Sequence, residues 1–429
     1  MRSPWKMLTS RGRVFLVLGL VTAAAGVLLG YEDITRIGVL LAALPVLALL
    51  LMPRRSPRIQ VRREADPGRL IPDERGAVET HFTNVGRRRT PVYLAEEHLD
   101  YQLGDRPRFV LPRMDPGEHR RLRYTVRSRH RGAYVLGPVV LRQRDPFGLT
   151  FLTLQLSSRS EVLVLPRTHH LGEGRVRGTS RGSEGEMPQM IALHGEDDVS
   201  IRTYRDGDEL RRVHWPATAH RGELMVRQED RPARRRAVLL LDSRERAHPG
   251  SGVRASYEWA VSAVASVAQH LEPQGFVIHL LTDSTVREGS ADHPVELDQA
   301  LTILARATPE RDARLARLAA VAAPFAAGGV LVVAAVVAHD EEDLRALASI
   351  RQPGSRALAF VLDPSRFGST ARAGDRAGGG EDTRGSAGGV GAAGALAQAG
   401  WRTVECGPHT ELPQAWAALG ESAQVGRSA

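Results

Sequence analysis

Carboxylates and histidines gather in residues 204–227, where Asp206, Asp208 and His214 lie close together in the chain. A carboxylate beside a histidine can perform general acid–base catalysis. The same groups can also hold a metal ion that activates a water molecule. One interpretation of this stretch is therefore a hydrolytic site built from these three side chains.

The stretch is also rich in arginine, whose planar guanidinium group suits a carboxylate. Asp206-Gly207 is a turn signal, and Asp206 or Asp208 can cap a short helix over Glu209 to His214. The second interpretation, which we prefer, is a buried arginine–carboxylate network. Such a network would dock the stretch on the following domain, with Trp215 as its apolar anchor.

A further set of candidates consists of four aspartates that follow predicted strands, namely Asp242, Asp283, Asp340 and Asp363. The carboxyl ends of parallel strands meet at one rim of a sheet, where α/β folds bind their ligands. Four carboxylates at one rim invite a divalent cation. The ordinary alternative is that Asp follows a strand because it caps the next helix.

The domain that would carry these aspartates covers residues 237–420, where predicted strands and helices alternate. The predicted strands are 237–242, 276–283, 329–338, 356–363 and 402–406, and the predicted helices are 256–271, 295–305, 311–325, 341–350 and 412–419. This order predicts a doubly wound α/β fold. A stretch rich in Gly, Ala, Arg and Ser at 368–394 is predicted to be a disordered insert.

Residues 55–165 are predicted to form a separate β domain, joined to the α/β domain by a connector over residues 166–236. Apolar residues alternate with polar ones, and turn signals recur at short intervals. The predicted strands are 58–63, 77–84, 90–96, 118–128, 134–142 and 162–165. This pattern favours a β-sandwich of immunoglobulin-like kind. The isolated His81, His98 and His119 are interpreted as ordinary strand residues.

The N-terminal part is predicted to be a membrane anchor over residues 1–53, with two transmembrane helices at about 14–30 and 34–52. Its apolar runs, Val14 to Gly30 and Ile37 to Met52, contain no charge. Each is slightly short of the roughly 20 residues that a spanning helix needs. A cleaved signal peptide and a buried globular hairpin are the alternatives.

Charge distribution sets the expected orientation of this anchor. Basic residues flank both runs, at Arg2, Lys6, Arg11 and Arg13 and at Arg54, Arg55, Arg58, Arg62 and Arg63. The positive-inside rule therefore predicts a multi-pass protein of the cell membrane whose soluble domains are cytoplasmic. A single cysteine, Cys406, permits no internal disulfide, which agrees with that compartment. The net charge of +9 suits an anionic membrane surface, and the scattered basic residues argue against nucleic acid.

The chain resembles the bacterial family called domain of unknown function 58. The resemblance rests on a signature segment, residues 202–227, containing Arg202 to Trp215 and Gly222 to Arg227. It extends to Arg131-Gly132-Ala133-Tyr134, to Asp145-Pro146-Phe147-Gly148-Leu149 and to the order of the parts. It implies that residues 237–420 are similar to the von Willebrand factor type A fold. It also implies that the chain is a membrane-anchored partner of MoxR-type AAA+ ATPases and that it belongs with proteins to which no enzymatic activity is attributed.

The resemblance also sets expectations about sites. The implied interaction residues are Tyr204, Arg205, Gly207, Asp208, Arg211, Arg212, His214, Trp215, Leu224 and Arg227. Type A domains often carry an Asp-x-Ser-x-Ser metal site, but here Arg244 and Arg246 stand at both serine positions after Asp242. Because guanidinium groups repel a cation, we expect a degenerate site at Asp242, Arg244, Arg246 and Asp340 that binds no metal.

These observations favour a non-enzymatic interaction or scaffold protein that acts with an AAA+ ATPase at the membrane. No cofactor and no small-molecule substrate are expected. Two other function classes stay open. One is a membrane-bound hydrolase that uses Asp206, Asp208 and His214, and the other is a divalent-cation-dependent adhesion module at the strand ends.

Overall fold

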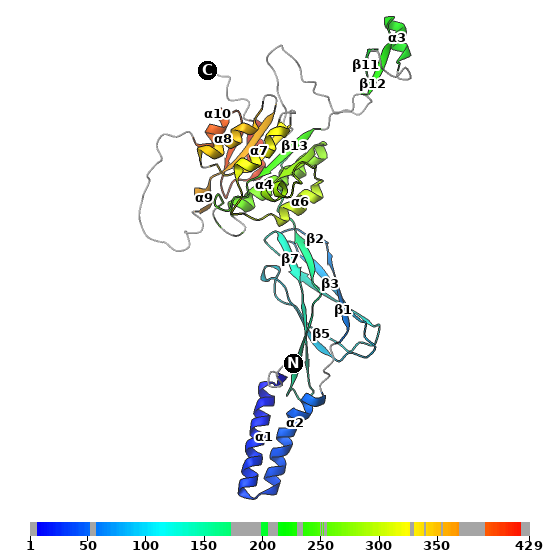
Figure 1. Ribbon diagram of the computed structural model, residues 1–429, viewed down its shortest axis with the longest axis vertical. Coiled ribbons are helices and arrows are strands. Elements are labelled where there is room, and N and C mark those ends of the chain that lie inside the picture. Colours follow the sequence, from blue (N-terminus) through cyan, green and yellow to red (C-terminus); the bar gives the residue numbers. More distant parts are fainter. Residues whose placement is uncertain are drawn as a thin grey trace, which may run out of the picture. The chain divides into compact units, whose positions relative to one another are not determined.

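The computed structural model describes residues 7–51, 57–172, 199–204, 213–229, 235–248, 250, 252, 255–326, 330–338, 340–352, 355–368 and 391–421. The chain divides into two compact units (Figure 1), Met1–Arg167 with Leu301–Thr308 and Thr168–Ala300 with Pro309–Ala429. Most of the predicted insert 368–394 and most of the predicted helix Glu209 to His214 lie outside the described residues.

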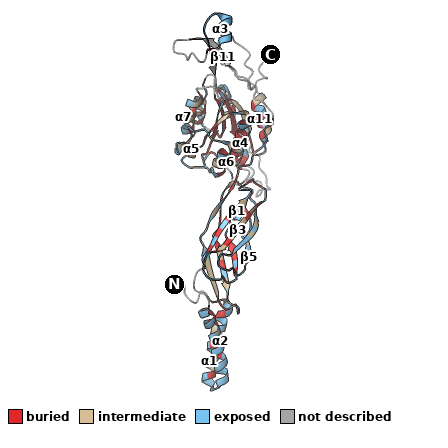
Figure 2. Ribbon diagram, turned by 90° about the vertical axis from the view of Figure 1, so that its right-hand side faces the viewer, coloured by how far each residue is buried: buried red, intermediate tan, exposed pale blue. Residues whose placement is uncertain are grey.

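Two long helices open the first unit, α1 (Ser10–Leu29) and α2 (Glu32–Leu51). Thr9 caps α1 by accepting a hydrogen bond from the Gly12 backbone N–H, and Gly30 closes the helix in the left-handed conformation. Both helices are long and apolar enough to cross a membrane. Most of their residues are exposed (Figure 2), which differs from a helix buried in a globular core.

The two helices pack through small residues. The buried positions of α1 are Gly12, Gly19 and Gly26, while α2 buries only Gly38, Pro45 and Ala48. A Cβ at Gly19 would lie 2.4 Å from the Ala42 backbone nitrogen, and one at Gly38 would lie 2.2 Å from that of Ala23. Small residues of this kind let helix backbones approach closely in lipid. Hydropathy alone did not predict this contact face.

Substitution of Gly19 by Leu is expected to separate α1 from α2, because the added side chain has no room against the α2 backbone. Overpacking of this kind costs about 1–3 kcal/mol. Spin labels on the two helices should report a longer mean distance in Gly19→Leu. In the control Ala24→Leu, which adds bulk at an exposed position, the distance should stay unchanged. An unaltered distance in Gly19→Leu would disprove this packing.

The β domain contains ten strands within its described residues. They are β1 (Ile59–Asp66), β2 (Arg69–Leu70), β3 (Gly76–Asn84), β4 (Tyr93–Glu97), β5 (Arg108–Leu111), β6 (His119–Val126), β7 (Gly132–Leu136), β8 (Val139–Arg144), β9 (Phe151–Leu156) and β10 (Ser160–Val164). Three sheets result, with orders β1-β3-β6, β2-β10-β7 and β5-β4-β8-β9.

Face-to-face packing of these sheets forms the core of the β domain. Alternate residues of β1, β3 and β6 point inward. One cluster joins the β1-β3-β6 sheet to the four-stranded sheet around Phe82, Tyr93 and Leu141. A second cluster joins it to β7 and β10 around Val78 and Val162.

One strand prediction for this domain was wrong. Residues 134–142 are not a single strand, because Gly137 adopts a φ of 87° and Pro138 has no N–H to continue the ladder. The chain therefore forms β7 and β8, which belong to different sheets.

The α/β domain is built on a five-stranded parallel sheet with the order β14-β13-β15-β16-β17. The strands are β13 (Arg236–Leu241), β14 (Val277–Leu281), β15 (Leu331–Val336), β16 (Arg356–Leu362) and β17 (Arg402–Cys406). The helices are α4 (Ser256–Leu271), α5 (Asp283–Arg287), α6 (Leu297–Arg306), α7 (Leu315–Ala326), α8 (Glu341–Ile350), α9 (Pro364–Gly368), α10 (Ala392–Gln398) and α11 (Leu412–Glu421).

Helices cover both faces of this sheet. The face that presents Val238 and Val332 packs against α7, α8 and α10. On the opposite face Phe360 contacts Trp259 of α4 and Trp416 of α11. The predicted doubly wound architecture is therefore present, and every predicted strand and helix of this domain has a counterpart.

The signature segment forms a small antiparallel module. Its strands are β11 (Val199–Thr203) and β12 (Met225–Glu229), with the short helix α3 (Trp215–Arg221) between them. The Tyr204 N–H donates to the Leu224 carbonyl, and the His214 N–H donates to that of Met225. None of the α3 residues is buried, so this helix contributes no side chain to a hydrophobic core.

Candidate functional site

The strand order places a topological switch point between β13 and β15. The chain leaves β13 for β14 on one side and later returns to β15 on the other. In open α/β sheets, ligands bind at the carboxyl ends of the strands at such a point. Here the first residue after β13 is Asp242, and its backbone N–H donates a hydrogen bond to the backbone carbonyl of Ala335 in β15. This is where a binding crevice would be expected.

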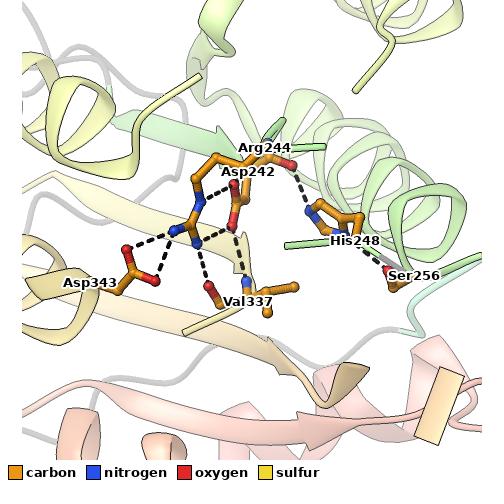
Figure 3. A network of polar contacts seen from close by, with 6 residues as sticks. All are labelled: Asp242, Arg244, His248, Ser256, Val337 and Asp343. Atoms are coloured by element: carbon orange, nitrogen blue, oxygen red, sulfur yellow. Dashed lines mark hydrogen bonds and ion pairs between the residues drawn. The ribbon is translucent and has the colours of Figure 1, made fainter. Parts of the chain in front are cut away.

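A guanidinium group occupies this position (Figure 3). Arg244 donates through Nε to Asp242 Oδ1 at 2.9 Å and through Nη2 to Oδ2 at 2.8 Å. Its Nη1 donates to both carboxylate oxygens of Asp343, at 2.7 and 2.8 Å. Nη2 also donates to the Val337 carbonyl. Each of the five N–H groups that arginine offers thus meets an acceptor.

The carboxylates around Arg244 are held in turn by the fold. The Asp242 side chain is fully buried, and it accepts hydrogen bonds from the backbone N–H groups of Val337 and Arg244. Asp343 lies in the first turn of α8, where the helix dipole favours a negative charge. Burial opposes the charge on Arg244, but hydrogen bonds and the charges of Asp242 and Asp343 raise its pKa. The group is a permanent internal cation.

His248 extends this network to α4. Its ring contacts the Asp242 carbonyl through Nε2 at 2.9 Å and Ser256 Oγ through Nδ1 at 3.1 Å. The ring also packs edge-on against Tyr257. Burial lowers the pKa of His248, against the opposing influence of Asp242. The neutral imidazole therefore serves as a structural link between the strand end and α4.

Two further acids at this rim, Asp283 and Asp363, are also matched by arginines. Asp283, at the start of α5, has a side chain only 1% exposed, and Arg287 lies 3.0 Å from it and Arg317 3.7 Å. Arg287 also pairs with Glu310, whose pKa is raised by burial and by the neighbouring Asp283 despite the opposing effect of Arg287. Two acids thus share one arginine.

Asp363 follows the same rule at the end of β16. It accepts hydrogen bonds from Ser365 and pairs with Arg366. These partners lower the pKa of Asp363 although burial opposes them. Among the described residues, no group of three or more His, Cys, Asp or Glu side chains is arranged to hold a metal ion.

The structure corrects the expected membership of the degenerate site. Asp242 and Arg244 are in contact. Asp340 is exposed and makes no side-chain hydrogen bond to cap α8, and Arg246 is also exposed. The second carboxylate is instead Asp343, which sequence reasoning missed. Its position in the first turn of the helix that follows β15 is the signal that could have identified it.

The signature residues are only partly described. Six members of the predicted cluster lie outside the described residues, namely Arg205, Asp206, Gly207, Asp208, Arg211 and Arg212. His214 accepts a hydrogen bond from the Ala217 N–H through Nδ1 at 3.2 Å and so caps α3. Arg227 lies in β12 and pairs with Ile201 in the backbone ladder.

The prediction that Trp215 is a buried anchor was wrong. Its exposed fraction is 68%, and that of the nearby Leu224 is 40%. Pro216 follows Trp215 at the start of α3, and a helix this short has no buried face to receive the indole. The module therefore presents a large aromatic side chain to its surroundings.

Replacement of Arg244 by Met is expected to lower the free energy of unfolding by about 3 kcal/mol, because it leaves two largely buried carboxylates without their cation. Chemical denaturation of the purified protein measures this change. The control Arg246→Met, at an exposed position of the same turn, should stay within about 0.5 kcal/mol of the parent. Equal stability of the two variants would refute the role given to Arg244.

Because burial favours the neutral form of His248, we expect the folded protein to lose stability in acid. Its pKa in the folded state lies below the ordinary value of 6.5, so the unfolded state binds more protons as the pH falls through 6.5. Stability is therefore fully present above pH 6.5 and falls below it. His270 and His279 act in the same direction. Denaturation at a series of pH values should give a shallower acid slope for His248→Gln, and an unchanged slope would contradict this assignment.

Comparison with solved structures finds remote similarities. A CARDB domain from Pyrococcus furiosus, in complex with di-metal ions, is 15% identical and covers 27% of this chain and 93% of its own, with a TM-score of 0.20. The putative ApaA protein from Bordetella pertussis is 14% identical and covers 27% and 99%, with a TM-score of 0.20. These likenesses carry no inference about fold or function. No curated protein matches the chain.

One family model does match. The family described as "Protein of unknown function DUF58" matches residues 200–352. This range begins in β11 and ends just after α8, so it contains the signature segment together with Asp242, Arg244 and Asp343. The central part of the chain is therefore similar to that family over the module and the switch-point site.

Proposed function

We propose that this protein is a membrane-anchored, non-enzymatic scaffold that works with a MoxR-type AAA+ ATPase in the assembly or maturation of other proteins. The observation that carries the proposal is the Arg244 guanidinium at the switch point. The place where an α/β sheet would bind substrate or cation holds an internal ion pair instead. An interaction role then fits the domain better than catalysis does.

The anchor is supported by the composition and packing of the hairpin. Its two helices are long and apolar enough to span a bilayer and are only sparsely buried. A cleaved signal peptide fits poorly, because loss of α1 would uncover the face of α2 formed by Gly38, Pro45 and Ala48. Basic flanks on both apolar runs support cytoplasmic soluble domains by the positive-inside rule.

The finer fold assignments belong to the same proposal. Two antiparallel sheets packed over one core support an immunoglobulin-like β domain. A doubly wound sheet with Asp242 directly after its first strand supports a von Willebrand factor type A-like α/β domain. In that assignment, Arg244 stands where a bound cation would otherwise balance the carboxylates.

The surface that we assign to the ATPase is the exposed side of the β11–α3–β12 module. Trp215 is the largest exposed side chain there, and Leu224 is also exposed. Aromatic residues at such positions often supply most of the energy of a protein–protein contact. The AAA+ partner itself is inferred from the family resemblance of the signature segment and of the order of the parts.

The alternative functions have weaker support. A hydrolase would need His214 free for proton transfer, yet its Nδ1 accepts the capping hydrogen bond of α3. A cation-dependent adhesion module would need Asp242 and Asp343 free to ligate, and both are held by Arg244.

The proposal is tested by capture of tagged full-length protein from native membranes after mild solubilisation. We expect an AAA+ ATPase to be identified by mass spectrometry among the retained proteins. Trp215→Ala should reduce its recovery about tenfold or more, since a hot-spot aromatic contributes about 2 kcal/mol. The matched control is Tyr101→Ala, an aromatic of the β domain that is 84% exposed. Recovery of intact protein without any AAA+ ATPase would overturn the proposal.

A further inference from the structure

A loop of the β domain is tied to the start of the first apolar helix. Thr9, which caps α1, donates through its hydroxyl to the carbonyl of Gly148 at 2.7 Å, and its N–H donates to that of Leu149 at 2.9 Å. Leu8 forms a bridge with Thr150. A Cβ at Gly12 would lie 2.1 Å from the Leu149 oxygen, so helix and loop are in direct backbone contact.

The loop is held in one conformation by its own hydrogen bonds. The carboxylate of Asp145 accepts from the N–H groups of Phe147 and Thr150, at 3.1 and 2.6 Å. The Gly148 N–H donates back to the Asp145 carbonyl, and Gly148 adopts a φ of 68°, which suits glycine. Asp145 is therefore committed to the turn, which fixes the position of the residue at its tip.

That residue is Phe147, whose exposed fraction is 68%. Leu149, two residues later, is only 3% exposed. The Phe147 side chain is not buried in this way. Because the turn holds the Phe147 side chain outward, its apolar surface stays in contact with water, which is unfavourable in free energy. A single exposed apolar side chain is common on protein surfaces, but the loop that carries Phe147 is tied to a helix long and apolar enough to span a membrane.

The depth of the loop relative to a bilayer follows from helix geometry. Thr9 precedes the first residue of the uncharged run, Val14, by about 7 Å at 1.5 Å per residue. The interfacial layer on each side of the hydrocarbon is about 5–8 Å thick. The loop that contacts Thr9 and Gly12 therefore lies within that layer when α1 spans. Exposed arginines at 11, 13 and 144 lie beside it and suit anionic headgroups.

We propose that the 145–150 loop is a second membrane contact, in which Phe147 inserts into the interfacial layer of the leaflet that α1 enters. This inference rests on the membrane anchor of the proposed function. Aromatic side chains favour this layer, and the insertion covers the exposed ring. The β domain is then fixed to the membrane by the Thr9 hydrogen bonds and by Phe147, and not only through the chain that follows α2.

The test places a nitroxide spin label at single cysteines in full-length protein reconstituted in vesicles of neutral and anionic phospholipid. Background labelling is low because Cys406, the chain's one cysteine, is buried. Labels at 147, at lipid-facing Leu18 and at exposed Tyr101 are compared for collision with oxygen and with a water-soluble nickel chelate. Tyr101 serves as the solvent reference because it is 84% exposed, and its neighbour Gln102 accepts a hydrogen bond from Tyr134 of β7.

We expect a label at 147 to be several-fold less accessible to nickel than one at 101, while a label at 18 reports the hydrocarbon. A label at 147 that matches 101, with 18 in lipid, overturns the loop contact and leaves the anchor standing. A label at 18 exposed to nickel overturns the anchor and the loop contact together. The three positions carry the same label, so differences between them report depth.

A second variant tests Phe147 itself. With the label moved to Arg144, Phe147→Asp should raise nickel accessibility there, because a charge is expelled from the interface. Phe147→Leu should leave the accessibility unchanged. An equal result for the two substitutions would show that the loop is near the membrane only because α1 holds it, and would refute insertion of the ring.

Discussion

The guanidinium of Arg244 between Asp242 and Asp343 is the interaction on which the α/β domain depends most. It links the end of β13, the end of β15 and the first turn of α8 at the switch point of the sheet. Because one carboxylate is fully buried and the other nearly so, the loss of their cation would leave uncompensated charge in the interior. The position where open α/β sheets usually bind a ligand is therefore occupied by an ion pair of the protein itself.

The same kind of pairing recurs at two other strand ends of this rim. Arg287 faces Asp283 and Glu310, and Arg366 faces Asp363, in the same way that Arg244 faces its partners. Trp215 on the signature module and Phe147 on the β domain are exposed, and we propose them as the contacts with a protein partner and with lipid.

Sequence patterns predicted the α/β fold well, because short apolar runs such as 237–241 are typical of a buried strand and alternate with segments of helical periodicity. The β domain was harder, since short strands β2, β5 and β9 carry little alternation and a left-handed Gly137 divides one expected strand. At the site, Arg244 and Asp242 are neighbours in the sequence, but the second partner of Arg244, Asp343, is distant in sequence and was not predicted. Trp215 was misjudged because hydrophobicity alone does not distinguish a core residue from an exposed contact.

The central claim is that an internal cation permanently occupies the switch point, and a crystal structure of the protein grown with Mn²⁺ tests it most directly. We expect the Arg244 guanidinium to lie within hydrogen-bond distance of both aspartates, with no anomalous manganese signal between them. Manganese ligated by Asp242 and Asp343, with Arg244 displaced towards solvent, would contradict it.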